Sequence, residues 1–335
     1  MSHQIALIVG GGINQEITPE VLRVIEAAGV EVAWNRVDVD AGDYPGAVAQ
    51  LQQAAGAVRE SGLALKTRLL TPPGGPTDSS NNLNVALRRE LGLFAGVRAV
   101  RSLPGVSTRF PDLDLLIIRE NSEDIYKGIE HEIVPGVIES IKVVTKDASE
   151  RIARFAFETA RYLERKHLTF VHKANIMKQS DGLFLNTVNE VASEYPELPL
   201  RTVIVDAACM QLVLNPYQFD VLLMGNLYGD ILSSLGNGIT GGISSSLGID
   251  IGDDVRIYEA IHGDAAELVG KGVANPLPLL TPAVDLLHYI DETEAADRIA
   301  AAIESVTVAG STVTGDLGGT ASTAEMTTAI IEAMD

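Results

Sequence analysis

The chain is poor in cysteine, in aromatic side chains and in long apolar runs. Its single cysteine, Cys209, excludes an internal disulfide, and its apolar neighbours predict a buried structural thiol. Aromatic residues make up only 5% of the chain, which favours an α/β protein over a β-sandwich. No apolar run approaches the roughly 18 residues of a membrane span, and the start MSHQIALIVGGG lacks the features of a signal peptide. We therefore expect a cytoplasmic protein that does not enter a membrane.

Positive charge is also scarce, because 25 Lys and Arg face 45 Asp and Glu and give a formal net charge of −20. A chain this acidic is not expected to bind nucleic acid or an anionic membrane. An anionic ligand would need a local group of cations, and six arginines occur between positions 88 and 119: Arg88, Arg89, Arg98, Arg101, Arg109 and Arg119. Guanidinium groups pair bidentately with carboxylates. Each arginine alone is more often a surface ion pair, but together they indicate a site for a polycarboxylate.

Short runs of Val, Ile and Leu alternate with Ala-rich helical patterns along the whole chain. This alternation predicts the α/β class. We expect Thr18 to be the N-cap of the first helix, with Pro19 at its first position. The predicted strands are 5–9, 31–37, 64–69, 114–118, 168–172, 201–205 and 221–224, and the predicted helices are 18–28, 47–61, 83–91, 149–166, 282–290, 295–307 and 323–334.

Three segments interrupt this alternation. Gly10-Gly11-Gly12 follows the first strand, but Gln15 stands where a dinucleotide-binding G-x-G-x-x-G pattern needs glycine, so a tight glycine turn is the better interpretation. The loop 71–82 is rich in Pro and Gly and leads into a helix whose free N–H groups could receive an anion. The segment 129–145 contains two β-rich arms around Pro135-Gly136, which predicts either a surface hairpin or an arm that meets another subunit.

Four separated segments carry residues suited to one reaction. They are Arg119 to Tyr126 (RENSEDIY), Val171 to Lys178 (VHKANIMK), Asp206, and Asn226 to Asp230 (NLYGD). An arginine can hold a carboxylate, two aspartates can hold Mg2+ or Mn2+, and a tyrosine and a lysine can move protons. This combination suits oxidation of a hydroxy acid followed by loss of CO2. An Asp at a helix start is, however, more often only an N-cap, and His172 and His262 lack the partners of a zinc site.

Together these segments resemble the β-decarboxylating dehydrogenases, the isocitrate, homoisocitrate and 3-isopropylmalate dehydrogenase family. The likeness runs over nearly the whole chain and is closest to NAD-dependent isocitrate-type members. It rests on RENSEDIYKGIEH, VHKANIMK, the aspartate of VDAACMQ, NLYGDILS, YEAIHGDAAELVGKGVANP and DLGGT, which occur in the family's order and spacing. The resemblance implies two α/β domains and not a classical Rossmann fold. Residues 1–95 and 245–335 would form a large nucleotide-binding domain, and 96–244 a small domain with a dimer-forming β-arm near 129–145.

The resemblance also assigns roles to single residues. It implies that Tyr126 protonates the enol and that Lys173 helps to deprotonate the substrate hydroxyl. It makes Asp206 and Asp230 metal ligands, and it has Lys173 and Asp206 reach in from the neighbouring subunit of a homodimer or higher homo-oligomer. The implied substrate contacts are Asn82, Asn84, Arg88, Arg98 and Arg119, and the implied cofactor contacts are Thr71, Asn175, Glu259, His262, Gly263, Glu267 and Asn275.

The chain departs from the family pattern at several of these positions. Glu267 replaces the lysine of NADP-using members, which favours NAD, with Mg2+ or Mn2+ as the metal. Ser234 stands where a second metal-side aspartate is usual, and the family's serine before Leu-Asn is Asn82. Asp264 adds a negative charge near the cofactor, and the turn 10–16 lacks its usual acidic residue and proline.

These departures leave three hypotheses open. The chain is an NAD-dependent isocitrate or homoisocitrate dehydrogenase, an enzyme for a modified substrate such as 3-isopropylmalate or a phosphonate or tricarboxylate analogue, or a non-catalytic regulatory subunit. Tyr126, Lys173, Asp206 and Asp230 are all present, which favours an active enzyme.

Overall fold

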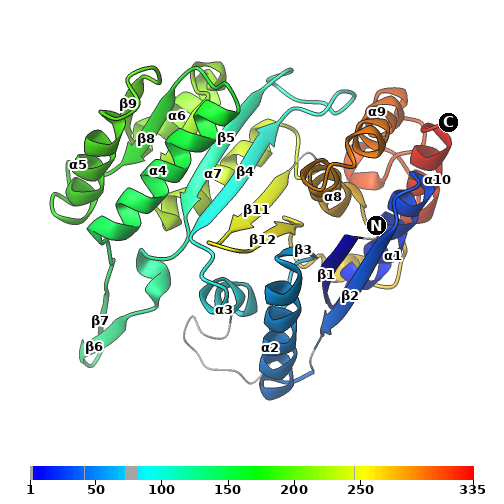
Figure 1. Ribbon diagram of the computed structural model, residues 1–335, viewed down its shortest axis with the longest axis horizontal. Helices are drawn as coiled ribbons and strands as arrows, with labels where there is room; N and C mark the ends of the chain where they lie inside the picture. Colours follow the sequence, from blue (N-terminus) through cyan, green and yellow to red (C-terminus); the bar gives the residue numbers. More distant parts are fainter. Residues whose placement is uncertain (1–2, 41, 72–81, 245) are drawn as a thin grey trace.

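The structure, a computed structural model, describes residues 3–40, 42–71, 82–244 and 246–335. Its main feature is a ten-stranded mixed sheet covered by helices on both faces (Figure 1). The strand order is β2-β1-β3-β12-β11-β4-β5-β10-β8-β9. The C-terminal end of the chain lies beside α10 (Figure 1). This architecture confirms the predicted α/β class.

The strands and helices have the following bounds. The sheet contains β1 (His3–Gly10), β2 (Val32–Val39), β3 (Leu63–Lys66), β4 (Ala95–Arg101), β5 (Asp114–Glu120), β8 (Leu168–His172), β9 (Leu200–Ile204), β10 (Val221–Met224), β11 (Leu247–Ile251) and β12 (Arg256–Glu259), and a separate ribbon contains β6 (Glu130–Val134) and β7 (Val137–Ser140). The helices are α1 (Asn14–Ala27), α2 (Tyr44–Ser61), α3 (Leu83–Glu90), α4 (Lys146–Tyr162), α5 (Ser180–Ala192), α6 (Val205–Leu214), α7 (Asn226–Ile239), α8 (Leu277–Tyr289), α9 (Thr293–Ala309) and α10 (Thr323–Glu332). Two short 3-10 helices, η2 (Ile125–Lys127) and η4 (Ala266–Leu268), belong to the site described below.

The pleat of each central strand sends alternate side chains into different helix layers. In β1, Ile5 and Leu7 pack in the hydrophobic cluster that contains α1, α8, α9 and α10, whereas Ala6 and Ile8 pack with α2 and α3. In β5, Leu116 and Ile118 face α4 and α5, whereas Leu115 and Ile117 face α6 and α7. Strands buried on both faces need apolar side chains at successive positions, which is why these segments read as continuous Val, Ile and Leu runs.

The two halves of the sheet meet at three antiparallel strands. Three neighbouring pairs are antiparallel: β12 with β11, β11 with β4, and β4 with β5. The strands on either side of them pair in parallel. One hydrogen-bonded sheet therefore runs through both of the predicted domains. The division into residues 1–95 with 245–335 and residues 96–244 stays a prediction.

Several predicted boundaries need correction. The first helix begins at Asn14 rather than Thr18, so Thr18 is not an N-cap; its hydroxyl donates to the Asn14 carbonyl at 2.6 Å within the helix. α8 likewise begins five residues before Pro282, so in both helices the proline lies inside the helix and not at its predicted start.

Two further predictions concern single residues. Cys209 is half-buried rather than buried, and burial raises the pKa of its thiol. The glycine turn is confirmed, because a Cβ on Gly10 would lie 2.1 Å from the Arg68 carbonyl oxygen.

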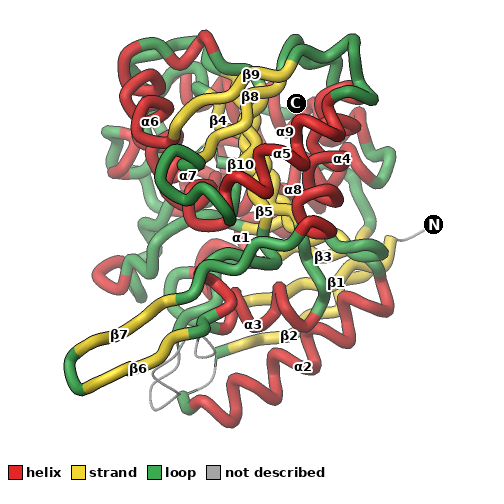
Figure 2. Tube along the Cα trace, turned by 90° about the vertical axis from the view of Figure 1, so that its left-hand side faces the viewer, coloured by secondary structure: helices red, strands yellow, loops and turns green. Residues whose placement is uncertain are grey.

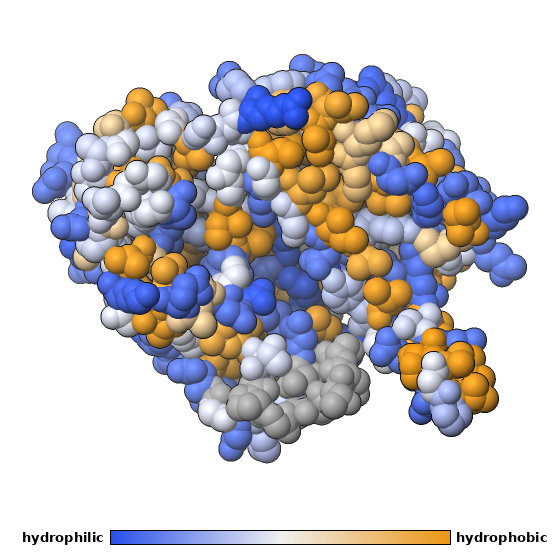
Figure 3. Space-filling view, turned by 180° about the vertical axis from the view of Figure 1, so that it is seen from behind, coloured by the Kyte–Doolittle hydropathy of each residue, from blue (hydrophilic) through white to orange (hydrophobic). Residues whose placement is uncertain are grey.

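The β6–β7 ribbon projects from the body and confirms the predicted hairpin around Pro135-Gly136 (Figure 2). Its apolar side chains are exposed: Ile133 by 54%, Val134 by 55% and Ile138 by 61%. Seen from behind, the ribbon is an isolated apolar projection (Figure 3). Its use as an arm for another subunit stays a prediction. Among the described residues, no helix is long and apolar enough to cross a membrane.

Candidate active site

A polar cleft lies where the two halves of the sheet meet, and its described part encloses about 870 Å³ of empty space. Figure 3 shows a hollow with hydrophilic residues between the two halves of the body. α3, β4, β5, η2, α7 and β12 all supply lining residues. Those predicted from the sequence are Asn82, Asn84, Arg88, Arg98, Arg119, Tyr126, Asp230, Glu259 and His262. The fold thus brings together segments separated by more than half of the chain.

Arg88 and Arg98 share two buried carboxylates behind the cleft. Arg88 Nε donates to Asp250 at 2.7 Å and its NH2 group to Glu259 at 3.0 Å. Arg98 NH2 donates to Asp250 at 3.0 Å and to Glu259 at 2.6 Å. Lys66 completes the cluster with a 2.9 Å ion pair to Glu259. Burial opposes ionisation of Glu259, but Lys66, Arg88 and Arg98 outweigh it and hold the pKa of Glu259 well below its usual value.

This cluster gives an acidic chain a local site for anions. Lys66, Arg88, Arg98 and Arg119 carry four positive charges, and Asp230, Asp250 and Glu259 carry three negative charges, which leaves one net positive charge. The carboxylates also fix the direction of each guanidinium group before a ligand arrives. Such fixed donors favour recognition of a carboxylate, because the arginine side chains lose little conformational entropy when the ligand binds.

A second group of side chains surrounds Asp230 on α7. The Tyr126 hydroxyl donates to Asp230 at 2.8 Å, and Arg119 NH1 donates to the same carboxylate at 2.5 Å. Asn226 accepts from Arg119 Nε and NH2 at 3.0 and 2.7 Å. Gly229 permits this contact, since a Cβ there would lie 2.5 Å from the Arg119 side chain.

These contacts set the proton affinities of Tyr126 and Asp230. Burial raises the pKa of Asp230, but Arg119 and the Tyr126 hydroxyl outweigh it, so the pKa is lowered overall. Burial and the neighbouring Asp230 raise the pKa of Tyr126, although Arg119 opposes this. Tyr126 therefore keeps its proton near neutral pH beside an ionised carboxylate. That arrangement suits a proton donor.

The two asparagines at α3 have structural partners inside the cleft. The Asn82 side chain caps α3 by accepting from the backbone N–H groups of Asn84 and Val85, so the predicted anion site at this helix start is already occupied. The Asn84 amide donates to the Leu69 carbonyl at 2.8 Å and accepts from Lys66 at 3.0 Å. Their predicted contacts with substrate stay predictions. Most of the predicted loop between Thr71 and Asn82 lies outside the described residues.

Lys173 and Asp206 lie elsewhere in the same chain. They form an ion pair with each other, in which the Asp206 side chain is 69% exposed, and neither lines the cleft. Asn175 is exposed on the segment that carries Lys173. Within the described residues, no group of three or more His, Cys, Asp or Glu side chains could hold a metal ion. One chain alone does not bring Asp206 and Asp230 together, and their joint metal site stays a prediction that requires a neighbouring subunit.

A second cavity adjoins the cleft and shares His262 with it. Its walls include the apolar side chains of Ile13, Ile243 and Leu268, which suit a flat aromatic ring. Asn275 lies in the same wall and donates to Asp316 at 2.8 Å. His262 Nε2 is buried and has no hydrogen-bond partner in the described part of the chain, and burial lowers the pKa of this imidazole. A nicotinamide dinucleotide fits these residues, because it would bring polar atoms to that nitrogen and a flat ring to the apolar wall.

The other predicted cofactor contacts lie around this cavity or at a distance from it. Gly263 lines the cavity, and Glu267 is exposed in the neighbouring η4. Thr71 is exposed and lines neither the cleft nor the cavity. Glu259 lines the cleft, where it is the counter-ion of the arginine cluster. Arg68 pairs with Asp264 at 2.7 Å, so the additional negative charge noted at Asp264 has a positive partner.

Three residues of the site had no signal in the sequence. Lys66 ends an apolar strand, Arg68 follows it, and Asp250 lies inside β11, which was not predicted as a strand. Their roles come from pairing between strands distant in the chain: β12 with β3, and β11 with β4. The role of Asp250 could have been predicted only if β11 had been recognised as a strand beside β4.

The fold and the paired cavities define a class of two-part α/β dehydrogenase whose site lies between the halves of one sheet. The family model described as isocitrate/isopropylmalate dehydrogenase matches residues 4–330, and the chain belongs to this family. Family membership confirms the predicted resemblance, the fold and the enzyme class. The NAD-dependent members of this family are oxidoreductases that use Mg2+ or Mn2+, which confirms the predicted cofactors at the level of the family.

The similar proteins include both catalytic and regulatory subunits. The chain is 43% identical to the NAD isocitrate dehydrogenase catalytic subunit 5 of Arabidopsis thaliana over 97% of this chain and 87% of that protein. It is 42% identical to regulatory subunit 1 of the same plant over 99% and 89%. The crystal structure of isocitrate dehydrogenase from Methylococcus capsulatus matches with a TM-score of 0.90 and 41% identity over 99% of each chain. Identity alone does not separate a catalytic role from a regulatory one.

Proposed function

We propose that this protein is an active, metal-dependent dehydrogenase that oxidises and decarboxylates a (2R,3S)-2-hydroxy acid of the isocitrate or homoisocitrate type with NAD. The observation that carries the proposal is the contact between the Tyr126 hydroxyl and Asp230 beside Arg119, in a cleft that also contains Arg88 and Arg98. It supports the proposal because a hydroxyl that keeps its proton, an ionised carboxylate and three guanidinium groups share one space.

In this proposal, Arg88, Arg98 and Arg119 bind the substrate carboxylates through those N–H groups that do not donate to Asp250, Glu259, Asp230, Asn226 or backbone carbonyls. Asp230, with Asp206 of a neighbouring subunit, would hold the metal. When bound, Mg2+ or Mn2+ supplies charge stabilisation to the substrate oxygens, and NAD accepts the hydride. Lys173 of the neighbouring subunit would take the hydroxyl proton, and Tyr126 would give a proton to the enol after CO2 has left.

NAD rather than NADP is supported by the charges at the cofactor cavity. Glu267 is exposed beside it, and Arg68, which lines the adjoining cleft, is already paired with Asp264. No cation among the described residues forms an ion pair with Glu267, so a 2′-phosphate would be repelled by this carboxylate. Free ribose hydroxyls can instead donate to that carboxylate. The predicted homodimer and cytoplasmic location remain part of the proposal.

The test is a substrate panel with the purified chain, Mn2+ and either NAD or NADP. D-malate, 3-isopropylmalate, isocitrate, homoisocitrate and phosphonate analogues are each assayed for reduced cofactor and for CO2. We expect NADH and CO2 in equal amounts with isocitrate or homoisocitrate, and only a low residual rate with Lys173→Met. Turnover of another panel member would instead support the modified-substrate hypothesis.

The regulatory hypothesis has one observation in its favour, which is Ser234 in place of a second carboxylate near Asp230. It predicts no turnover of any panel member by the chain alone. A second, catalytic chain would then be needed for activity, and binding of isocitrate without turnover would be detectable by calorimetry. That result would overturn the proposal of an active homomer.

A further inference from the structure

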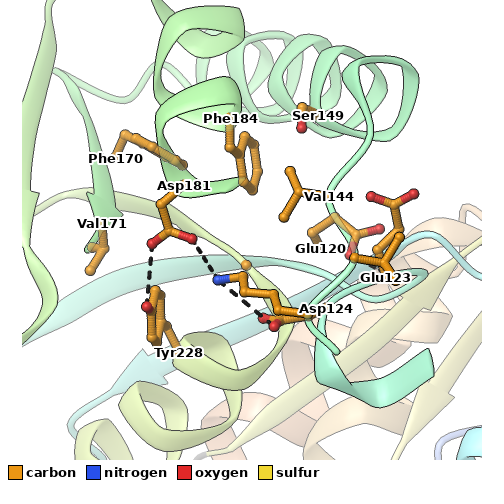
Figure 4. Close-up of a pocket in the computed structure, with 13 residues that line it drawn as sticks. Glu120, Glu123, Asp124, Val144, Ser149, Phe170, Val171, Asp181, Phe184 and Tyr228 are labelled. Carbon is orange, nitrogen blue, oxygen red and sulfur yellow. Dashed lines mark hydrogen bonds and ion pairs between the residues drawn. The ribbon is translucent and has the colours of Figure 1, made fainter. Parts of the chain in front are cut away.

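A small buried cavity lies beneath the segment that carries Lys173, apart from the cleft (Figure 4). Asp181, near the start of α5, projects into it and is only 3% exposed. Its Oδ2 atom accepts the backbone N–H of Lys173 at 2.6 Å, and its Oδ1 atom accepts from the Lys142 ammonium group at 2.6 Å. A buried carboxylate with two strong donors on opposite oxygens fixes the distance between their segments.

The backbone at Lys173 is held from several sides. The next N–H group, of Ala174, donates to His172 Nδ1 at 3.1 Å. The Lys173 carbonyl accepts from the N–H groups of Ile176 and Met177, each at 2.9 Å. The partners of the Ala174 N–H and of the Lys173 carbonyl belong to the same short segment, whereas Asp181 ties the Lys173 N–H to α5. The Gly182 N–H also donates to the Met177 carbonyl at 3.2 Å, so α5 holds the turn that follows β8 at two points.

The same network reaches the two elements that carry Tyr126 and Asp230. Lys142 lies 3.8 Å from Asp124, which is the N-cap of η2 and so precedes Tyr126 by two residues. The Tyr228 hydroxyl donates to Asp181 at 3.3 Å, and Tyr228 precedes Asp230 by two residues on α7. Figure 4 shows one ammonium group joined to Asp181 and Asp124, and the Tyr228 hydroxyl joined to Asp181. Asp124 also accepts the Leu227 N–H at 3.0 Å.

From this geometry we propose that Asp181 is a positioning residue for Lys173. It fixes the lysine's backbone relative to the elements that carry Tyr126 and Asp230 in the same chain. The inference rests on the proposed function, in which Lys173 acts in a neighbouring subunit's cleft. Each chain would then hold its own Tyr126 and its outgoing Lys173 in one rigid unit, so that two adjacent clefts form with matched geometry.

The central experiment is a double-mutant cycle between Asp181→Asn and Lys173→Met, with the intact homomer. An amide has a single oxygen, so in Asp181→Asn one of the two donors, Lys173 N–H or Lys142, must face an NH2 group. We expect kcat to fall about 100-fold, because small misplacements of a catalytic group have effects of that size. The KM values for substrate and NAD should stay within about twofold. In the Lys173→Met background, Asp181→Asn should have almost no further effect.

A matched control lies in the same cavity wall. Glu123 is also a buried carboxylate and accepts from the Thr145 N–H and hydroxyl, each at 2.8 Å, but it holds the start of α4 and not Lys173. Glu123→Gln should lower the melting temperature and have the same small effect on kcat with or without Lys173. If Asp181→Asn does not fold, Lys142→Met, which keeps most of the aliphatic stem, takes its place in the cycle.

The possible results separate this inference from the proposed function. If Asp181→Asn lowers kcat equally in both backgrounds, its role is only structural and the inference is wrong. If Lys173→Met alone leaves kcat unchanged, the proposed function is wrong about Lys173. A large effect of Lys173→Met together with an unchanged kcat in Asp181→Asn overturns the inference alone.

Discussion

At the scale of single residues, the proposed metal site depends on which groups already occupy the oxygens of Asp230. Arg119 and Tyr126 both donate to this carboxylate, and the Ser234 hydroxyl, one turn later on α7, donates to the Asp230 carbonyl at 3.1 Å. Within the described residues of this chain, a metal at Asp230 would therefore find one charged ligand, with Ser234 exposed beside it. Affinity for a divalent cation rises with the number of carboxylates that face it.

Ser234→Asp should tighten Mn2+ binding by about tenfold, because it adds one carboxylate to the proposed site. The free Mn2+ concentration can be followed by electron paramagnetic resonance during a titration. Ser234→Asn, which has nearly the same shape without the charge, is the control and should leave the binding constant unchanged. Equal constants for all three proteins would mean that position 234 does not face the ion.

Prediction from the sequence reached the residues whose chemistry is unusual in an acidic chain. The arginines at 88, 98 and 119 stood out by their number, and Tyr126 and Asp230 by their segments. Lys66 and Asp250 did not stand out, because their importance arises only when β3, β11 and β12 pair. A single buried lysine or aspartate in an apolar strand has no periodic signal. The ion-pair partner that offsets the cost of burying its charge comes from a strand distant in the chain.

At the scale of elements, the sequence predicted β1, β5, β8 and β10, whose buried residues form continuous apolar runs. β8 and β10 have the predicted bounds, since their continuous apolar runs end sharply. β4, β11 and β12, at the junction of the two halves, were not predicted as strands. Arg98 and Asp250 interrupt their apolar patterns, and both face the site. The polar residues that form the site therefore interrupt the apolar patterns by which these strands would have been predicted.

The β6–β7 ribbon allows a direct test of the proposed subunit contact. Replacing Ile133 and Ile138 together by serine should weaken or abolish the oligomer and lower activity in parallel, because a lone chain lacks Lys173 and Asp206 at its cleft. The melting temperature of the body should change little, since both side chains are exposed. Sedimentation velocity measures the oligomer, and the panel assay measures activity.

The control for this test is Glu139→Ser, an exposed polar position on β7. It should change neither the oligomer nor the activity. A monomer of the double variant with full activity would contradict the shared site. An unchanged oligomer would show that the exposed apolar side chains of the ribbon are not needed for assembly.

At the scale of the whole molecule, a shared site makes two inactive variants complementary. Tyr126→Phe damages the cleft of its own chain, whereas Lys173→Met damages the cleft of its neighbour. Mixed dimers should then contain one intact site and one site with both defects. Random mixing makes half of the dimers mixed, so activity should return to about a quarter of the wild-type value.

This experiment needs the two variants to be dissociated and reassembled together, with each variant treated alone as the control. Activity of the mixture is measured with the best substrate of the panel. A mixture that stays as inactive as its components would place Lys173 and Tyr126 in the same cleft of one chain, or outside the reaction. The single-chain geometry, in which Lys173 does not line the cleft, favours recovery.

The unbroken backbone pairing from β2 to β9 has a mechanical consequence. Cleft walls that belong to one sheet cannot swing on a flexible linker, so any narrowing around a ligand has to come from extra twist at β11, β4 and β5. Arg98 and Arg119 lie on β4 and β5 themselves. The twist of these strands and the strength of anion binding would then change together. A substrate whose carboxylate does not reach Arg98 and Arg119 would not induce the extra twist, and the cleft would stay open.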